Sequence, residues 1–378
     1  MQLLLIEIGL VLLLLGLAAF LAVKIKISVV PIFLIIGLAF GKGGLLPLEV
    51  SSEFLETGAH FGAILLLLML GLEHSARDLA GAFTERRFVG FIDFFVNAIP
   101  GALVALFLGW GVVGAVVLGG ITYVSSSGIA AQMMREAGWQ RSEISRRVTG
   151  VLVFEDLALA PYLPLLSTIV AGLGAIAGFV SVTSAVLITA VALLIALRGE
   201  NAVSRLFNIQ APGGLLLTVF GGAIFVAGVA ELVGFSSAVA AFLVGLVLTG
   251  EVASVVRLRL SPLRDLFSAI FFLFFGLTID PADLLSVWPL AVVLGLLGVA
   301  GKMYVGWLVA GDMSDKSAWR RAGAFLIPRG EFSIVIAGLA TVTTFGSQLQ
   351  ALTVAYVLFT SIAASIALRY FRSGFDKI

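Results

Sequence analysis

Residues 121–128 read ITYVSSSG and interrupt an otherwise apolar segment that extends from residue 112 to 135. Serine hydroxyls compete with the helix for backbone hydrogen bonds, and glycine is a weak helix former, so this stretch predicts a break at the segment centre. About 202 residues later, the PRG sequence at 328–330 interrupts the segment 319–341 in the corresponding place. A broken helix exposes backbone carbonyls and helix ends, which can coordinate ions or offset buried charge.

The composition places these segments in a membrane. Of the 378 residues, 60% are hydrophobic and 12% are charged, and the mean hydropathy is +1.15. An average soluble domain carries about 25% charged residues, so this chain lacks the polar surface that a soluble protein needs. The 23 basic residues nearly balance the 22 acidic ones, so no basic character indicates a nucleic-acid partner. The absence of cysteine excludes disulfides, thiolate metal sites and cysteine nucleophiles.

A helix needs about 20 apolar residues to cross the hydrocarbon core of a bilayer. With charged residues, proline and glycine as boundaries, the sequence predicts thirteen segments: 2–23, 28–41, 57–72, 88–110, 112–135, 146–170, 174–197, 213–232, 236–250, 262–280, 287–310, 319–341 and 348–370. The first is not a signal peptide, because its basic residues, Lys24 and Lys26, follow the apolar run. The prediction is an all-α polytopic membrane protein.

Lysine and arginine divide unequally between alternate loops. The loops after odd-numbered segments, together with the C-terminal tail, hold 20 of them, whereas the loops after even-numbered segments hold only Lys42. Because basic residues accumulate in cytoplasmic loops, this distribution predicts an external N-terminus and a cytoplasmic C-terminus in a prokaryotic plasma membrane.

The two halves of the chain contain matching stretches. FLIIGLAFG at 33–41 reads like FLVGLVLTG at 242–250, and MLGLEHSARDL at 69–79 reads like FFGLTIDPADL at 274–284. The nearly equal offsets indicate a duplication with a shift of seven helices, although glycine- and leucine-rich runs also match by chance. An odd shift inverts the second copy, as in many secondary transporters. We therefore expect one membrane domain over 1–378, with inverted repeats at about 28–170 and 236–370.

Ionisable groups inside the membrane cost several kcal/mol and need a partner or a function. When residues near the segment ends are set aside, six remain in the predicted segments: Asp93, Glu155, Asp156, Lys302, Arg329 and Glu331. Asp156 lies ten residues into its segment, which corresponds to about 15 Å and therefore to the midplane. Asp93 is five residues from the predicted start of its segment, and we expect it at the interface.

The adjacent carboxylates of Glu155 and Asp156 cannot both stay ionised cheaply in a low dielectric. We expect Lys302 to pair with one of them, either for structure alone or for coupling. The other carboxylate then carries a proton or a desolvated cation, but not both. Pro161 lacks an N–H and frees the carbonyl of Leu157 as a further cation ligand. Competition for one carboxylate is the simplest mechanism of cation/proton antiport.

Other polar groups have two interpretations. The hydroxyls of Thr122, Ser125, Ser126 and Ser127 either line a cation site or only join helices. Arg329 and Glu331 are expected to neutralise each other or the helix ends, rather than to contact the cation. His60 and His74 have no neighbouring ligands at a useful spacing, so no bound metal cofactor is expected.

Five short motifs occur in order along the chain: GLE at 71–73, SSSG at 125–128, FED at 154–156, GK at 301–302 and RGEF at 329–332. In these motifs the sequence resembles the monovalent cation:proton antiporters of the Kef and NapA type. The resemblance implies a homodimer, with a dimerisation domain and a core domain that contains two crossed broken helices. It also implies that Asp156 carries the ion and the proton, and that Lys302 pairs with the residue at position 155.

Two features depart from the Kef pattern. Glutamate at position 155 replaces the usual glutamine, which leaves the stoichiometry open. We also expect no cytosolic nucleotide-binding domain, since the sequence stops eight residues after its last segment. We therefore expect gating by a separate cytosolic regulatory subunit, by pH, or by residues removed from this chain.

The sequence as a whole predicts an elevator-type antiporter that exchanges K⁺ or Na⁺ for H⁺ at Asp156, without a cofactor. One alternative is a ligand-gated, channel-like K⁺ efflux system, and another is a proton-coupled symporter of organic anions. An enzyme is not expected, because no nucleophile and base, and no metal cluster, fall at one depth.

Overall fold

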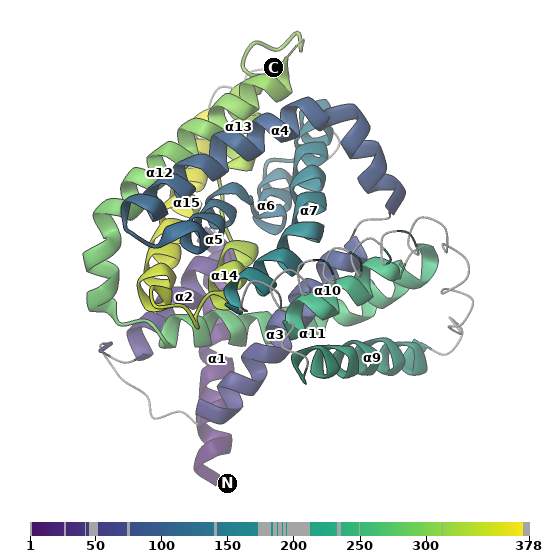
Figure 1. Cartoon of the computed structure of the whole chain (residues 1–378), viewed down its shortest axis with the longest axis vertical. Coiled ribbons are helices and arrows are strands. Elements are labelled where there is room, and N and C mark those ends of the chain that lie inside the picture. Colours follow the sequence, from purple (N-terminus) through teal and green to yellow (C-terminus); the bar gives the residue numbers. More distant parts are fainter. Residues whose placement is uncertain are drawn as a thin grey trace. The chain divides into compact units, whose positions relative to one another are not determined.

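The computed structural model of the chain is helical throughout its described part, in which no strand occurs (Figure 1). The structure describes residues 2–25, 28–41, 43–44, 52–73, 76–139, 142–172, 183, 187, 191, 194, 212–232, 236–248, 250–311 and 313–372. The predicted segment 174–197 lies outside these residues, apart from four single positions.

The helices are α1 Gln2–Ile25, α2 Val29–Phe40, α3 Ser52–Glu73, α4 Ala76–Phe107, α5 Gly111–Tyr123, α6 Ser127–Glu136, α7 Glu143–Val170, α9 Pro212–Leu232, α10 Ser237–Val247, α11 Gly250–Leu277, α12 Pro281–Ala310, α13 Ala318–Leu326, α14 Glu331–Leu339 and α15 Gly346–Arg372. Within the described ranges, ten spans are long and apolar enough to cross a membrane, and α2 and α10 are shorter apolar helices. The prediction of an all-α polytopic membrane protein is confirmed, and its thirteen segments are an approximate count.

Helix α11 begins at Gly250 rather than at residue 262, so the predicted loop before it is helical. The reason is amphipathic spacing: Val252, Val256 and Leu260 recur every fourth residue and are each at most 1% exposed. The intervening arginines, Arg257 and Arg259, lie on the exposed face. Charged residues limit the part of a helix that can lie in lipid, but the helix itself can continue through them.

Both predicted breaks are present. Helix α5 ends at Tyr123 and α6 begins at Ser127, and the residue that follows α5, Val124, is extended with φ −74° and ψ 128°. Helix α13 ends at Leu326 and α14 begins at Glu331. Each break therefore leaves four or fewer residues without helical hydrogen bonds, and their backbone groups need other partners.

The two breaks lie against each other. The N–H of Ser126 donates to the carbonyl of Pro328 at 2.8 Å, and the hydroxyl of Ser333 donates to the carbonyl of Ile121 at 3.0 Å. Pairing of the interrupted segments in this way matches the crossed arrangement that the resemblance implies.

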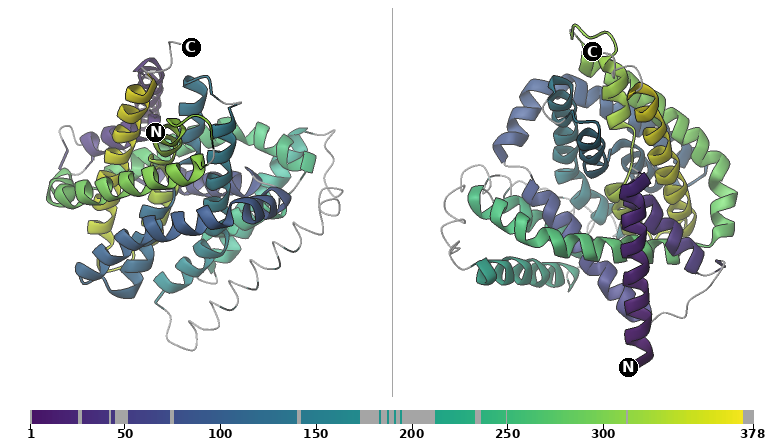
Figure 2. Two further views of the ribbon diagram at one scale, coloured as in Figure 1. Left: turned by 90° about the horizontal axis from the view of Figure 1, so that it is seen from above. Right: turned by 180° about the vertical axis from the view of Figure 1, so that it is seen from behind.

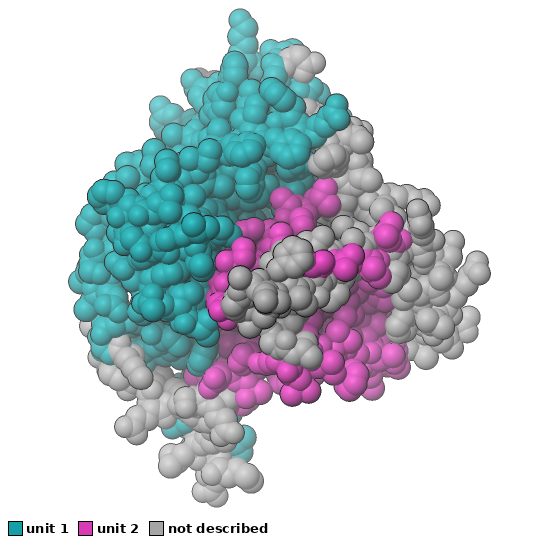
Figure 3. Space-filling model, viewed as in Figure 1, with its two compact units in different colours: residues 1–52, 86–155, 272–378 teal, residues 53–85, 156–271 magenta. Residues whose placement is uncertain are grey.

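The chain forms two compact units (Figure 3). Unit 1 comprises residues 1–52, 86–155 and 272–378, and unit 2 comprises residues 53–85 and 156–271. In unit 1, α12 packs along α13 and α15, as the rear view in Figure 2 shows. Both breaks belong to unit 1, whose apolar core includes Val148, Val305 and Phe325.

The matched glycines of the two halves make reciprocal contacts. Gly37 of α2 lies so close to α11 that a Cβ atom there would be 2.8 Å from the Cα of Gly276. Gly245 of α10 packs in the same way on α3, where a Cβ atom would be 3.0 Å from the Cα of Gly71. Gly245 is the counterpart of Gly37, and Gly276 is the counterpart of Gly71 at the offset of 205. A twofold relation between the halves requires this exchange of partners, which supports the predicted duplication.

We expect Gly276→Ala to destabilise the protein by about 1–3 kcal/mol, because the added methyl group overpacks a backbone contact. A Cβ atom at Gly276 would lie 2.5 Å from the carbonyl oxygen of Leu34. Gly222→Ala in α9 is the control, since nothing lies within 4 Å of a Cβ atom there. Melting temperatures of the two variants in detergent test the expectation, and equal values would contradict it.

Candidate functional site

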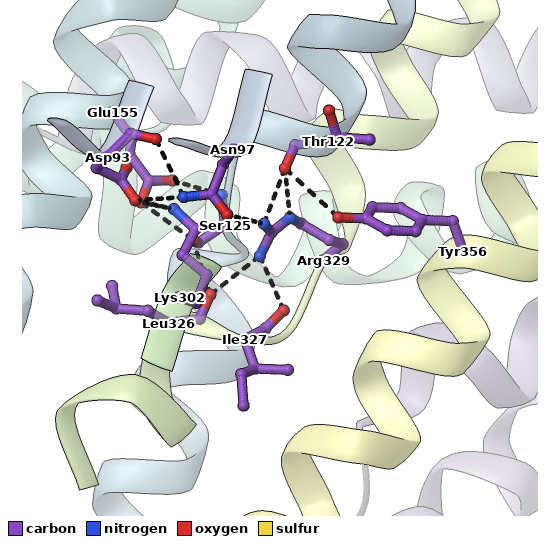
Figure 4. A network of polar contacts seen from close by, with 10 residues as sticks. All are labelled: Asp93, Asn97, Thr122, Ser125, Glu155, Lys302, Leu326, Ile327, Arg329 and Tyr356. Carbon is purple, nitrogen blue, oxygen red and sulfur yellow. Dashed lines mark hydrogen bonds and ion pairs between the residues drawn. The ribbon is translucent and has the colours of Figure 1, made fainter. Parts of the chain in front are cut away.

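A buried network of polar contacts surrounds the two breaks (Figure 4). All of its ten residues belong to unit 1, and they come from α4, α7, α12, α15 and both breaks with their flanking helix ends: Asp93, Asn97, Thr122, Ser125, Glu155, Lys302, Leu326, Ile327, Arg329 and Tyr356. The network therefore joins segments from the two halves of the chain.

Lys302 of α12 lies between two carboxylates. Its Nζ atom is 2.6 Å from Oδ1 of Asp93 and 3.0 Å from Oε1 of Glu155. The side chains of Lys302 and Asp93 are 0% exposed and that of Glu155 is 1% exposed. The ring of Tyr123 adds a cation–π contact, with its centroid 5.6 Å from Nζ. The expected pairing of Lys302 with one α7 carboxylate is present, and Asp93 is a second partner.

Glu155 is fastened to the α5–α6 break. Its Oε2 atom accepts a hydrogen bond from the backbone N–H of Ser125, and its Oε1 atom lies 3.0 Å from the Ser125 hydroxyl. That hydroxyl is also 2.9 Å from the carbonyl oxygen of Leu326, the last residue of α13. One serine thus connects the carboxylate of α7 with both broken helices.

Arg329 is 0% exposed and uses its guanidinium group on backbone carbonyls. Nη2 donates to the carbonyl of Thr122 at 2.8 Å, and Nη1 donates to those of Leu326 and Ile327 at 3.0 and 2.8 Å. These carbonyls lie at the C-terminal ends of α5 and α13, where the helix dipole is negative. Of the two expected roles, Arg329 therefore performs the neutralisation of helix ends. The hydroxyl of Tyr356 also contacts the Thr122 carbonyl, at 3.4 Å.

The remaining predicted hydroxyl groups have different surroundings. Thr122 donates its hydroxyl to the carbonyl of Leu118 at 3.0 Å, within its own helix. Ser126 caps α6, and its hydroxyl also donates to Oε2 of Glu331 at 2.8 Å. Ser127 is only partly buried. The structure thus brings Ser125 to Glu155, and Ser126 to Glu331, as two separate contacts.

Asp156 follows Glu155 on α7 and is 5% exposed. The helix continues past it through Pro161 and Pro164 to Val170, so the carboxylate lies well inside a membrane span. Adjacent positions on a helix point about 100° apart, so the two carboxylates face different surroundings. In the described ranges, no three His, Cys, Asp or Glu side chains gather as a metal site.

The expectation that Asp93 is interfacial is wrong. Helix α4 begins at Ala76 rather than at residue 88, and the Asp93 side chain is fully buried against Lys302. Asn97, one turn later, donates to Oδ1 of Asp93 at 3.0 Å and also contributes to the network. A signal was present in the sequence, because two polar residues at i and i+4 share one face of this apolar stretch. The prediction judged the burial of Asp93 by its distance from the predicted helix start, and so it did not use this pair of polar residues.

The formal charges of the four central residues cancel. Asp93 and Glu155 each contribute −1, and Lys302 and Arg329 each contribute +1. A buried cluster without net charge is far cheaper to keep in a low dielectric than any of its members alone.

The comparisons with known proteins point to transporters. Residues 9–371 match a family model described as sodium/hydrogen exchanger, transmembrane. The K(+)/H(+) antiporter subunit KhtU of Bacillus subtilis is 30% identical over 372 residues, covering 94% of this chain and 90% of that protein. The ammonium/H(+) antiporter subunit AmhT of Alkalihalophilus pseudofirmus is 31% identical, covering 96% of this chain and 94% of that protein.

Two further matches show the extent of the similarity. The glutathione-regulated potassium-efflux system protein KefC of Klebsiella pneumoniae is 30% identical over 94% of this chain, which spans only 58% of KefC. The solved structure of the sodium proton antiporter MjNhaP1 from Methanocaldococcus jannaschii superposes with a TM-score of 0.67 at 18% identity, covering 98% of this chain and 99% of that one. The latter similarity concerns the fold alone.

We expect Arg329→Lys to destabilise the protein by about 3 kcal/mol, because an ammonium group cannot reach the carbonyls of both helix ends. Arg320→Lys is the control, since Arg320 lies in α13, the helix that precedes the break with Arg329, and is exposed. Thermal unfolding in detergent distinguishes them. A melting temperature of Arg329→Lys equal to that of the control would show that the guanidinium contacts contribute little.

Proposed function

The chain belongs to the sodium/hydrogen exchanger family, and we propose that this cation/proton antiporter exchanges K⁺ or Na⁺ for protons at Asp156. The observation that carries the proposal is the position of Asp156, which is 5% exposed inside α7 and follows Glu155 directly. Ser125 and Lys302 engage both oxygen atoms of Glu155, which gives Glu155 a structural role. We assign the exchange to Asp156, the position that the resemblance to the Kef and NapA antiporters indicates.

A desolvated carboxylate binds either a proton or a cation. Binding both would leave a net positive charge in the membrane unless the cluster supplied a further negative charge. The central cluster of Asp93, Glu155, Lys302 and Arg329 is neutral, so binding one positive charge at Asp156 gives a neutral loaded site. Oxygen atoms of α7 and of the broken helices supply further cation ligands, among them the carbonyl of Leu157 that Pro161 leaves without a helical donor.

The proposed movement is elevator-like alternating access. The breaks and the buried network are tied together by hydrogen bonds from several helices, so they are suited to move as one body that carries the site across the membrane. We propose that inverted repeats at about 28–170 and 236–370 form this transporter, and that two protomers form a homodimer through the dimerisation domain. The loop charges favour an external N-terminus and a cytoplasmic C-terminus in a prokaryotic plasma membrane.

The names of the relatives support a proposal for the substrate cation and for the regulation of transport. The names of KhtU, AmhT and KefC refer to potassium and ammonium, and that of MjNhaP1 refers to sodium. We include K⁺, Na⁺ and NH₄⁺ among the candidate substrates and favour K⁺. KhtU and AmhT are named as antiporter subunits, which supports a separate cytosolic regulatory subunit for this chain.

We expect Asp156→Asn to abolish cation-induced proton movement, because an amide cannot exchange a proton for a cation. A pH-sensitive dye in everted membrane vesicles measures this movement after the addition of KCl or NaCl. Asp265→Asn is the control, since Asp265 is exposed and its carboxylate pairs with Arg264 on the same helix, α11. Wild-type transport by inserted Asp156→Asn protein would overturn the proposal.

Competition between the two ions also predicts a pH dependence. Where Asp156 is mostly protonated, each further unit of acidification should raise the apparent KM for the cation about tenfold, while the maximal rate at saturating cation persists. At higher pH the apparent KM should become constant. Exchange rates in proteoliposomes with K⁺, Na⁺ and NH₄⁺ at several pH values test this and rank the cations. An apparent KM that is independent of pH would contradict a shared site.

A further inference from the structure

Lys302 is bound more closely by Asp93 than by the carboxylate of α7. The distances from Nζ are 2.6 Å to Oδ1 of Asp93 and 3.0 Å to Oε1 of Glu155. Glu155 is shared, because it also accepts two hydrogen bonds from Ser125 in the α5–α6 break. Asp93 contacts no break in this way, and it stands on a different helix from the proposed exchanging carboxylate.

The Asp93 carboxylate is directed to Lys302 by its neighbour on α4. The side-chain amide of Asn97 donates to Oδ1 and to the backbone carbonyl of Asp93, both at 3.0 Å. The oxygen of the same amide lies 3.5 Å from Nη2 of Arg329. In contrast, Oδ2 of Asp93 is buried and has no hydrogen-bond partner among the described residues. The carboxylate therefore acts through one oxygen atom, which faces the ammonium group.

A buried ammonium group without a counter-ion costs several kcal/mol. If Glu155 were the sole partner of Lys302, any change at Glu155 during transport would leave the lysine charge uncompensated. Asp93 offers Lys302 a second counter-ion, 2.6 Å away, that does not belong to α7.

We propose that Asp93 is the fixed counter-ion of Lys302, a positioning residue that keeps the ammonium group charged and in place throughout the exchange cycle. This inference rests on the proposed exchange at Asp156. It adds a residue of α4 to the exchange machinery, and it determines the stoichiometry, because a cluster of constant charge leaves Asp156 to exchange one cation for one proton.

Four charged or titratable groups contact this lysine, directly or through Asn97, among the described residues. They are Asp93 of α4, Tyr123 of α5, Glu155 of α7 and, through Asn97, Arg329 of the α13–α14 break. With Asp93 present, the acidic and basic members balance, so the exchange carries no net charge. In Asp93→Asn, Glu155 is the one remaining carboxylate of the cluster. The two positive charges of Lys302 and Arg329 then exceed the negative charge, and the cluster is no longer neutral.

The test measures net charge and proton movement in parallel. Purified full-length protein is reconstituted in proteoliposomes as wild type, Asp93→Asn, Asp93→Glu and Asp283→Asn. Asp283 is the matched control, because it is an exposed acid on α12, the helix that carries Lys302. Solid-supported membrane electrometry detects net charge after a K⁺ or Na⁺ jump, and an entrapped pH dye detects exchange. Size-exclusion chromatography verifies that each variant is folded.

The wild type and Asp283→Asn should exchange protons without a transport current. Asp93→Asn should exchange more slowly and with a net charge for each cation. Asp93→Glu should restore exchange without current, which a merely structural role of the aspartate would not produce. If Asp93→Asn is inactive or unfolded, Asp93→Glu decides the question: restored currentless exchange supports the role, and folded but inactive protein overturns it.

Two other results would overturn the inference while the proposed antiport stands. One is a net transport current in the wild type, and the other is currentless exchange at the wild-type rate in Asp93→Asn. A wild-type protein that moves no protons in response to K⁺, Na⁺ or NH₄⁺ would overturn the proposed antiport itself, and the role of Asp93 with it.

Discussion

The hydrogen bonds of the Arg329 guanidinium to two helix ends are the interaction on which the site depends. A membrane helix that stops midway leaves carbonyl groups without donors, and lipid offers none. Arg329 supplies donors to the ends of α5 and α13 together, and it balances the negative ends of both helix dipoles. Two breaks at one depth are thereby stabilised by a single side chain, and the other contacts of the site are arranged around it.

The buried positive charge of Arg329 needs negative charges nearby, which the rest of the cluster supplies. Arg329 and Lys302 bring two positive charges into the membrane, and Asp93 and Glu155 bring two negative ones. Their mutual neutralisation lowers the free-energy cost of burying these charges in a low dielectric. It also gives the two carboxylates on α7 different roles. Glu155 belongs to the balanced cluster, whereas Asp156 carries the charge that we propose to be matched alternately by a proton and by a cation.

The proposed duplication is consistent with a cluster that draws on both halves of the chain. Each half contributes one broken helix, and hydrogen bonds between the two breaks join the halves. The reciprocal glycine contacts, Gly37 on α11 and Gly245 on α3, place one short helix of each half on a long helix of the other. If the halves are inverted repeats, as we propose, the site can open to either side by equivalent movements, which is the geometry that alternating access requires.

The sequence by itself predicted an all-α membrane protein, the two breaks, the matching stretches of the two halves and the pairing of Lys302 with one of the two adjacent carboxylates. Each of these follows from a local property: apolar length, helix-breaking residues, matching stretches, or a charge that must be paired. Tertiary structure alone decided which groups meet. Asp93 pairs with a lysine 209 positions away, and Arg329 binds the carbonyl of Thr122, 207 positions earlier. Such partners cannot be read from spacing, because burial depends on how neighbouring helices cover a position and not on its distance from the nearest charged loop.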